Sequence, residues 1–391
     1  MRGPNEVYEH LGPFSDLVIA LRGGEGPLYP LTRPGPETRS RVREVLGVSF
    51  RGAEPLAPRQ EAFWSTDDVI GEEVTWSVGY GPRTAAWLLR PRGKHGGRLP
   101  AVLALHDHSD FKYFGKEKIA VGPHVPDESV VEHRRRMYEG RAYANDLASR
   151  GNVVLVHDVF LWGSRRFPLD VIPEPARRVG RQSVGHHDRR CKSAEIALYD
   201  AVAGQHEHVV EKYCSVLGTT LAGVVNYEDR VALNYLLQRP EVDPERVACI
   251  GLSGGGNRAA LLTATHDALR ATVIVGLMTT YEGLLDRHLA SHTWMLFPAG
   301  WARFGDWPDL AASRAPHPLL VQYNLDDELF SRTGMMAAHH RLADHYAWAG
   351  AGGRYSGEFF AGTHKFDQSM QSSAFRWLDA HLAPSCVLNR L

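Results

Sequence analysis

Five short apolar runs, each bounded by turn residues, constrain the fold of this 391-residue chain more than any other feature. They contain almost no polar residue, which is typical of strands buried on both faces of a parallel sheet. Helical patterns separate them, as between residues 221 and 240. The runs occupy residues 101–105, 153–156, 247–250, 271–275 and 319–321. Strands alternating with helices imply right-handed crossovers, so the sequence predicts a mostly parallel, doubly wound α/β sheet.

The segments outside these runs predict the domain organisation. An alternating segment at 73–79 and a second one at 83–90 indicate an antiparallel pair that opens the sheet. Residues 1–70 are rich in proline, arginine and glycine, and we expect an N-terminal arm that packs on a main domain at 71–385. Residues 160–220 are too many for a structureless connection. They predict a cap or lid insertion over the carboxyl edge of the sheet, where open α/β sheets bind ligands.

Charge and hydropathy exclude several classes of protein. Lysine plus arginine number 44 and aspartate plus glutamate 45, so no net charge attracts nucleic acid or anionic membranes. No stretch is apolar enough to span a bilayer, and the N-terminal segment is broken by Pro4, Gly12 and Pro13 in a way unlike a signal peptide. We expect a soluble, cytoplasmic protein that binds neither nucleic acid nor membranes. A homo-oligomer is compatible with the sequence.

The cysteines favour neither a zinc site nor a disulfide framework. None of the four forms a C-x-x-C pair, so free thiols are expected. They are Cys191, Cys214, Cys249 and Cys386.

One stretch, ACIGLSGGGNRAALL at 248–262, runs from an apolar strand into a serine ringed by glycines and then into a helix. It contains G-x-S-x-G, a weak signal alone that gains weight from the strand–turn–helix setting. Glycines suit this turn because the serine backbone is strained and a neighbouring Cβ would collide with the strand and helix. The stretch predicts Ser253 as a nucleophile. An incidental glycine-rich loop or a phosphate cradle is the alternative.

A serine hydroxyl needs a base, and in this setting the chain order is serine, acid, histidine. The turn after the strand near residue 320 holds Asp326 and Asp327. We predict Asp327 as the orienting acid, with Asp326 second, and a helix N-cap as the alternative role of either. His364 follows the next predicted strand, at 355–360, and is the predicted base; a surface histidine is the alternative.

The remaining site residues follow from these three. The oxyanion hole is expected to combine the backbone N–H groups of Gly254 and His108. Predicted substrate-binding residues are His106, Trp162, Arg165 and Trp294, although large aromatic residues more often belong to the core. His-Glu-His at 206–208 looks metal-like, but positions two apart on a helix point away from each other. No metal and no cofactor are expected.

Several segments also carry a family resemblance: 105–118, 158–165, 206–212, 240–256, 292–294, 304–310, 323–330 and 362–366. Together they resemble the α/β-hydrolase superfamily, and within it the dienelactone-hydrolase and acetyl-xylan-esterase-like branch. The resemblance implies the α/β-hydrolase fold and a triad of Ser253, Asp327 and His364. Many relatives have His-Gly where this chain has His106-Asp107, so the chain departs from the family pattern in the predicted oxyanion loop.

These observations predict a cofactor-free serine hydrolase that cleaves a small carboxylic ester or lactone through an acyl-serine intermediate. A first alternative is a biosynthetic acyltransferase or cyclase, because the same triad can deliver the acyl group to an alcohol, amine or internal nucleophile if the cap keeps water out. A second is a non-catalytic binding module on a hydrolase fold, which a missing triad residue would indicate.

Overall fold

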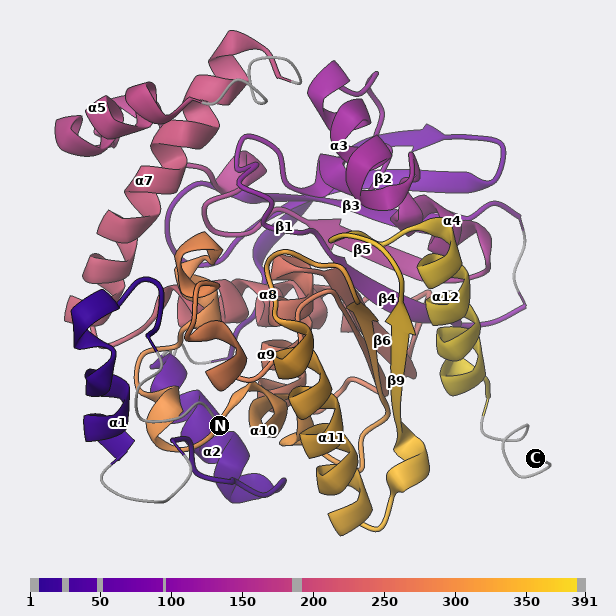
Figure 1. Cartoon of the computed structure of the whole chain (residues 1–391). Helices are drawn as coiled ribbons and strands as arrows, with labels where there is room; N and C mark the ends of the chain where they lie inside the picture. Colours follow the sequence, from indigo (N-terminus) through magenta and orange to yellow (C-terminus); the bar gives the residue numbers. More distant parts are fainter. Residues whose placement is uncertain (1–6, 23–27, 48–51, 94–95, 185–191, 385–391) are drawn as a thin grey trace.

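The computed structural model describes residues 7–22, 28–47, 52–93, 96–184 and 192–384. Within them a nine-stranded sheet has the order β1-β2-β3-β5-β4-β6-β7-β8-β9 (Figure 1). The pairs β1·β2, β2·β3 and β3·β5 are antiparallel. All the pairs from β5 through β4, β6, β7 and β8 to β9 are parallel. The strands are β1 (Leu56–Ser65), β2 (Val69–Ser77), β3 (Thr84–Pro91), β4 (Leu99–Leu105), β5 (Val153–His157), β6 (Val242–Leu252), β7 (Ala271–Val275), β8 (Leu319–Asn324) and β9 (Tyr355–Phe360). The predicted α/β fold class, with its mostly parallel sheet and opening antiparallel pair, is confirmed.

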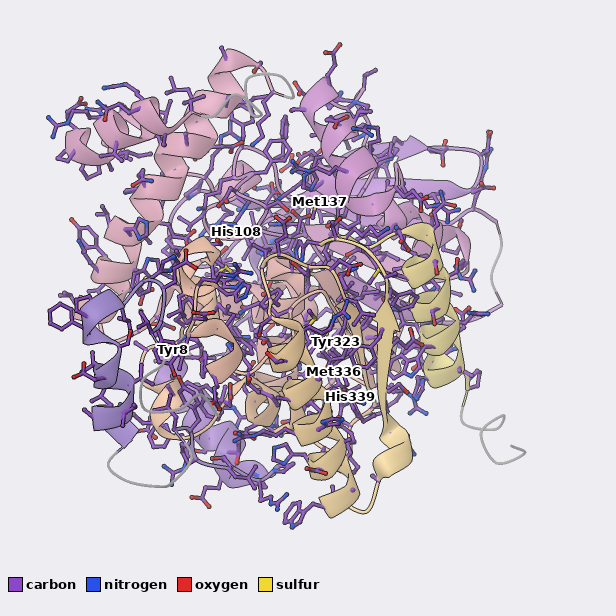
Figure 2. All side chains as sticks on the ribbon, in the orientation of Figure 1. Tyr8, His108, Met137, Tyr323, Met336 and His339 are labelled. Atoms are coloured by element: carbon purple, nitrogen blue, oxygen red, sulfur yellow. The ribbon has the colours of Figure 1, made fainter. Side chains whose placement is uncertain are left out.

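Helices cover both faces of the sheet, which explains why the five runs in its central strands are apolar. Successive side chains of β4 alternate between two hydrophobic clusters: Ala101 and Leu103 belong to one, Val102 and Ala104 to the other. Side chains fill the space between sheet and helices (Figure 2). One face packs on α2 (Pro36–Leu46), α8 (Leu221–Leu237), α9 (Gly254–Thr265), α10 (Trp307–Ala312) and α11 (Arg332–Trp348), the other on α3 (Glu128–Tyr138), α4 (Tyr143–Ser149) and α12 (Gln368–Leu382).

The sheet begins earlier than the sequence predicts. Strand β1 lies inside the segment 1–70, which was expected to form only an N-terminal arm. Most of its side chains are exposed, and its register with β2 shifts twice. An exposed edge strand buries neither face fully, so no hydrophobic alternation marks it in the sequence. The same segment contains α1 (Asp16–Arg22) and α2.

In its described residues, the insertion expected at 160–220 contains two short 3₁₀ turns, Gly163–Arg165 and Leu169–Val171, followed by the helices α5 (Glu174–Ser183) and α7 (Ala194–Val216). Ser193 caps α7 by accepting a hydrogen bond from the Ile196 amide, as its place before the helical pattern suggests. Helix α5 packs on α7 at the upper left of Figure 1, with Gly180 against Val202. That this segment acts as a lid stays a prediction.

Two further predictions concern membranes and thiols. None of the helices in the described part of the chain has the length and apolar character needed to cross a bilayer. Cys214 and Cys249 are buried free thiols, and Cys249 lies in β6 as expected. Cys191 and Cys386 lie outside the described residues.

Candidate active site

Ser253 occupies a sharp turn between β6 and α9, with φ 55° and ψ −117°. A non-glycine residue rarely adopts such a conformation, and it persists only where the surroundings enforce it. Here the Ser253 amide donates to the Val275 carbonyl at 2.8 Å, and the Ser253 carbonyl accepts from the Asn257 amide at 2.9 Å. The strand β7 on one side and the first turn of α9 on the other therefore hold the strained backbone.

The glycines beside Ser253 allow close approach of the loop that follows β4. A Cβ on Gly255 would overlap the Leu105 carbonyl oxygen. A Cβ on Gly254 would come within 2.8 Å of the His108 backbone nitrogen. The two amides predicted for the oxyanion hole, those of Gly254 and His108, therefore lie next to each other.

His364 is oriented by Asp327. Its Nδ1 lies 2.6 Å from Asp327 Oδ2, and the other carboxylate oxygen accepts from the Leu329 amide at 2.9 Å. Because Nδ1 donates to a carboxylate, Nε2 is the nitrogen that can accept a proton. His364 Nε2 is buried and has no hydrogen-bond partner among the described residues.

Asp326 has a different role from its neighbour. Its side chain is 55% exposed, pairs with Arg332 at 3.2 Å and accepts from the Gly362 amide at 2.8 Å. It thus links the two loops that carry Asp327 and His364. The alternative that either aspartate caps the following helix is wrong, because the N-cap of α11 is Ser331.

A pocket of about 100 Å³ brings the predicted nucleophile, base and oxyanion donors together. Apolar side chains from the loops after β7 and β8 form part of its wall. Its lining consists of His108, Ser109, Asp110, Ser253, Gly254, Asn257, Leu277, Ser291, His292, Thr293, Leu296, Leu329, Phe330 and His364.

Two residues predicted to bind substrate, Arg165 and Trp162, do not line this pocket, and these predictions are corrected. Arg165 is 3% exposed; its guanidinium pairs with Glu228 at 2.5 Å and donates to the carbonyls of Tyr80 and Pro82. The guanidinium of Arg165 therefore makes its hydrogen bonds within the protein and is not directed at a substrate. Trp162 is 1% exposed and packs edge-on against His108 with 5.1 Å between ring centroids. Its ring supports the oxyanion loop from behind.

The other two predicted substrate-binding residues lie beside the pocket without lining it. His106 is buried, and its Nδ1 lies 3.0 Å from the Asp107 carbonyl oxygen. Burial lowers the pKa of His106 well below its usual value, so the ring is neutral at pH 7. Trp294 is 39% exposed, follows the lining residue Thr293, and donates from its indole N–H to His208 Nδ1 at 2.8 Å.

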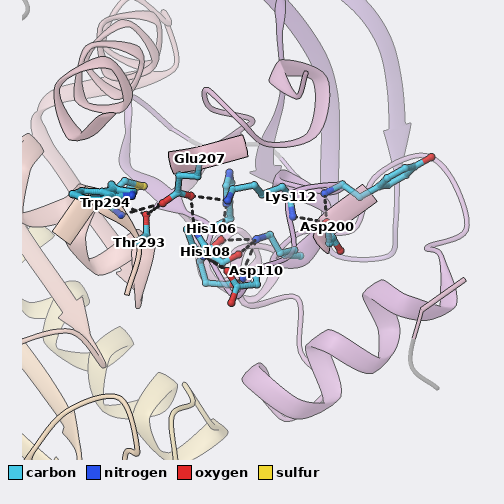
Figure 3. A network of polar contacts seen from close by, with 12 residues as sticks. His106, His108, Asp110, Lys112, Asp200, Glu207, Thr293 and Trp294 are labelled. Atoms are coloured by element: carbon cyan, nitrogen blue, oxygen red, sulfur yellow. Dashed lines mark hydrogen bonds and ion pairs between the residues drawn. The ribbon is translucent and has the colours of Figure 1, made fainter. Parts of the chain in front are cut away.

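Glu207 on α7 is a residue of this region that the sequence reasoning missed (Figure 3). Its Oε2 accepts from Lys112 Nζ at 2.6 Å and from His108 Nε2 at 3.1 Å. Its Oε1 accepts from Thr293 Oγ1 at 2.6 Å and from the Trp294 amide at 3.0 Å. One buried carboxylate therefore ties α7 to both loops that border the pocket.

The charge of Glu207 is well compensated. Burial alone would raise the pKa of this carboxyl, but Lys112 and His108 beside it hold the pKa well below its ordinary value. His108 Nδ1 accepts from the Asp110 amide at 3.1 Å, so the proton of a neutral His108 resides on Nε2 and points at Glu207. The signal in the sequence was the His-Glu-His run at 206–208. In the parts of the chain that the structure describes, no cluster of histidine, cysteine and acidic side chains suits a metal ion.

Comparison with known proteins finds one similar curated protein and several solved structures of similar fold. No protein-family model matches the chain. Over 347 residues it is 21% identical to a Bacillus subtilis protein named "Putative hydrolase YtaP", covering 88% of this chain and 99% of that protein.

Several solved structures have a similar fold at lower sequence identity. A methylesterase is 17% identical with a TM-score of 0.55, covering 88% of this chain; the chain spans 62% of that protein's length. Acetyl xylan esterase 1 from Thermoanaerobacterium is 15% identical with a TM-score of 0.52, covering 92% of this chain and 100% of that one. A glucuronoyl esterase from Solibacter usitatus has a TM-score of 0.60 at 14% identity, covering 88% and 92%. The chain has the α/β-hydrolase fold of these esterase structures.

Proposed function

We propose that this protein is a serine esterase that cleaves small carboxylic esters or lactones. One observation carries the proposal: His364, which donates from Nδ1 to Asp327 at 2.6 Å, lines the same pocket as Ser253, and its Nε2 has no hydrogen-bond partner among the described residues. This is the arrangement in which an imidazole can take a proton from a serine hydroxyl. The strained backbone of Ser253 supports the same role, because strain of this kind clusters at functional sites.

The reaction follows from these groups. His364 Nε2 removes the proton from Ser253 Oγ as Oγ bonds to the ester carbonyl carbon, and the negative charge moves to the carbonyl oxygen. When the tetrahedral intermediate collapses, the bond to the alkoxy oxygen breaks and that oxygen takes the proton from His364. Water then attacks the acyl-serine with His364 again as base, releasing the acid and restoring Ser253. Asp327 stabilises the imidazolium in both halves.

Two backbone amides are suited to hold the oxyanion. The amides of Gly254 and His108 lie side by side, and among the described residues neither has a hydrogen-bond acceptor. Buried, unpaired N–H groups are rare in proteins, so a ligand or water is expected to satisfy them. Preorganised donors of this kind supply a large share of the rate in acyl transfer. The names of the similar structures, a methylesterase and an acetyl xylan esterase among them, support an ester as substrate.

Hydrolysis of p-nitrophenyl esters from acetate to octanoate tests this function. Turnover is expected to fall with chain length, because a pocket of about 100 Å³ has little room for a long acyl chain. Ser253→Ala should reduce turnover to the background rate, whereas Ser149→Ala, on α4, should not. Adding an acceptor alcohol and analysing the products distinguishes a hydrolase from an acyltransferase. A folded protein whose turnover survives Ser253→Ala would contradict the proposal.

A further inference from the structure

Buried cations hold three successive backbone carbonyls of the loop after β4. Arg258 donates from Nη1 to the His106 carbonyl at 3.2 Å. Lys118 Nζ donates to the Asp107 carbonyl at 2.5 Å and to the His108 carbonyl at 3.2 Å. Lys118 ends a 3₁₀ turn, Lys116–Lys118, and is completely buried. None of these contacts belongs to the proposed mechanism above, and each acts on the backbone that carries one of its oxyanion donors.

The contact with the Asp107 carbonyl fixes the direction of the His108 amide. Both groups belong to one planar peptide unit, and in a trans peptide the C=O and N–H point in opposite directions. Because the Asp107 oxygen faces Lys118, the His108 N–H points away from Lys118. Gly254 lies close to this nitrogen, because a Cβ on Gly254 would come within 2.8 Å of it. Lys118 therefore turns this N–H toward the elbow that carries Ser253.

The positive charge adds to the effect. A cation bound to a peptide oxygen polarises the unit and makes its N–H a stronger donor, and the effect is larger in a low-dielectric interior than in water. We infer that Lys118 is a positioning residue for the oxyanion hole: its bond to the Asp107 carbonyl orients and polarises the His108 amide, and its bond to the His108 carbonyl holds the next peptide unit of the same loop. This inference rests on the proposed function.

Lys118 has a third contact, with the Asp107 carboxylate, that defines the competing explanation. Its Nζ lies 3.5 Å from Asp107 Oδ2, and both side chains are fully buried. The Asp107 carboxylate also accepts from His133 Nε2 at 3.2 Å and from the Tyr138 hydroxyl. Lys118 could then serve only to neutralise Asp107. The two roles are separable, because removing both charges restores neutrality but leaves the two carbonyls without their donor.

The test compares Lys118→Met, the double variant Lys118→Met/Asp107→Asn, and the control Lys116→Met. Lys116 is also buried, and it pairs with Asp158 at 3.0 Å and Glu117 at 2.8 Å rather than with the loop carbonyls. kcat and KM for p-nitrophenyl acetate are measured per active site, counted by fluorophosphonate titration. The affinity for a trifluoromethyl ketone, which forms the oxyanion on Ser253, is measured in parallel.

Deleting an oxyanion donor outright lowers kcat by about 10²–10³-fold, so misdirecting one is expected to cost about 10–100-fold. We expect this loss in both Lys118 variants, with KM changed less than about twofold and ketone affinity reduced by the same factor as kcat/KM. Lys116→Met should keep kcat within about threefold of wild type.

Two results would overturn the inference: recovery of wild-type kcat in the double variant, or an equal loss in Lys116→Met. If Lys118→Met does not fold, the double variant, which lacks the whole charge pair, decides by the same comparison. A wild-type protein without turnover would instead refute the proposed function.

Discussion

Replacing Glu207 by glutamine is expected to destabilise the fold strongly. The carboxylate is buried, accepts four hydrogen bonds, and is the ion-pair partner of Lys112, whose side chain is 2% exposed. Removing one member of a buried pair leaves the other charge uncompensated, which costs about 3–5 kcal/mol. Because glutamine keeps the shape of the side chain and part of its hydrogen bonding, we expect the free energy of unfolding to fall by about 3 kcal/mol.

A double-mutant cycle with Lys112→Met tests the pair itself. If Glu207 and Lys112 compensate each other, Glu207→Gln/Lys112→Met should be more stable than the sum of the single losses predicts, by about 1–3 kcal/mol. The assay is urea unfolding at pH 7, followed by circular dichroism and by tryptophan fluorescence, whose coincidence checks two-state behaviour. Additive losses, or a single-variant loss below about 1 kcal/mol, would refute the reasoning.

The same pair predicts a pH dependence. The folded-state pKa of Glu207 is held below its unfolded value of 4.5. Its contribution to stability is therefore complete above about pH 4.5 and is lost as the pH falls through the folded-state pKa. The stability difference between wild type and Glu207→Gln should shrink as the pH is lowered below about 4.5. A difference that stays constant from pH 7 to pH 3.5 would contradict the assignment of an ionised Glu207.

Two further predictions concern the site and its surroundings. Asp327→Asn is expected to lower kcat about 10³–10⁴-fold because His364 loses the carboxylate that fixes its tautomer, whereas Asp326→Asn should cost less than about tenfold; comparable losses in steady-state assays would contradict the distinction. Arg165→Met should lower the thermal unfolding temperature, because its buried carboxylate partner loses its ion pair, and should leave KM within about twofold of wild type. A KM that rises about tenfold with an unchanged unfolding temperature would instead support a substrate-binding role for Arg165.

The central sheet could be predicted from the sequence because its physical cause is local. The central runs of strands β4 to β8 are covered on both faces, so nearly every residue in these runs is apolar, and the run 101–105 shows this directly. Strand β1 lies exposed at the edge of the sheet, where polar residues are tolerated and no pattern survives. Its pairing with β2 depends on backbone hydrogen bonds that any sequence can make.

The candidate site shows the same division. Gly254 and Gly255 are required by backbone approaches next to Ser253, so the elbow is visible in the sequence. Asp326 and Asp327 are neighbours with identical chemistry, and only the course of the turn decides which one reaches His364.

Charged residues buried by distant partners were the hardest to predict. Arg165 pairs with Glu228, 63 positions away, and Lys112 pairs with Glu207, 95 positions away. No local sequence pattern indicates such a pair. An arginine near a predicted cap therefore resembles a residue that binds an anionic substrate. Likewise, a glutamate flanked by histidines resembles part of a metal motif, while its partners come from two other loops.

Mass spectrometry of the protein treated with a fluorophosphonate tests the central claim most directly. We expect one phosphonyl group per chain, carried by the peptide that contains Ser253, and none on Ser253→Ala. We also expect that His364→Ala slows the labelling, because the hydroxyl loses its base. A folded wild-type protein that neither labels at Ser253 nor hydrolyses any ester would contradict the account and favour a binding module that retains the α/β-hydrolase fold.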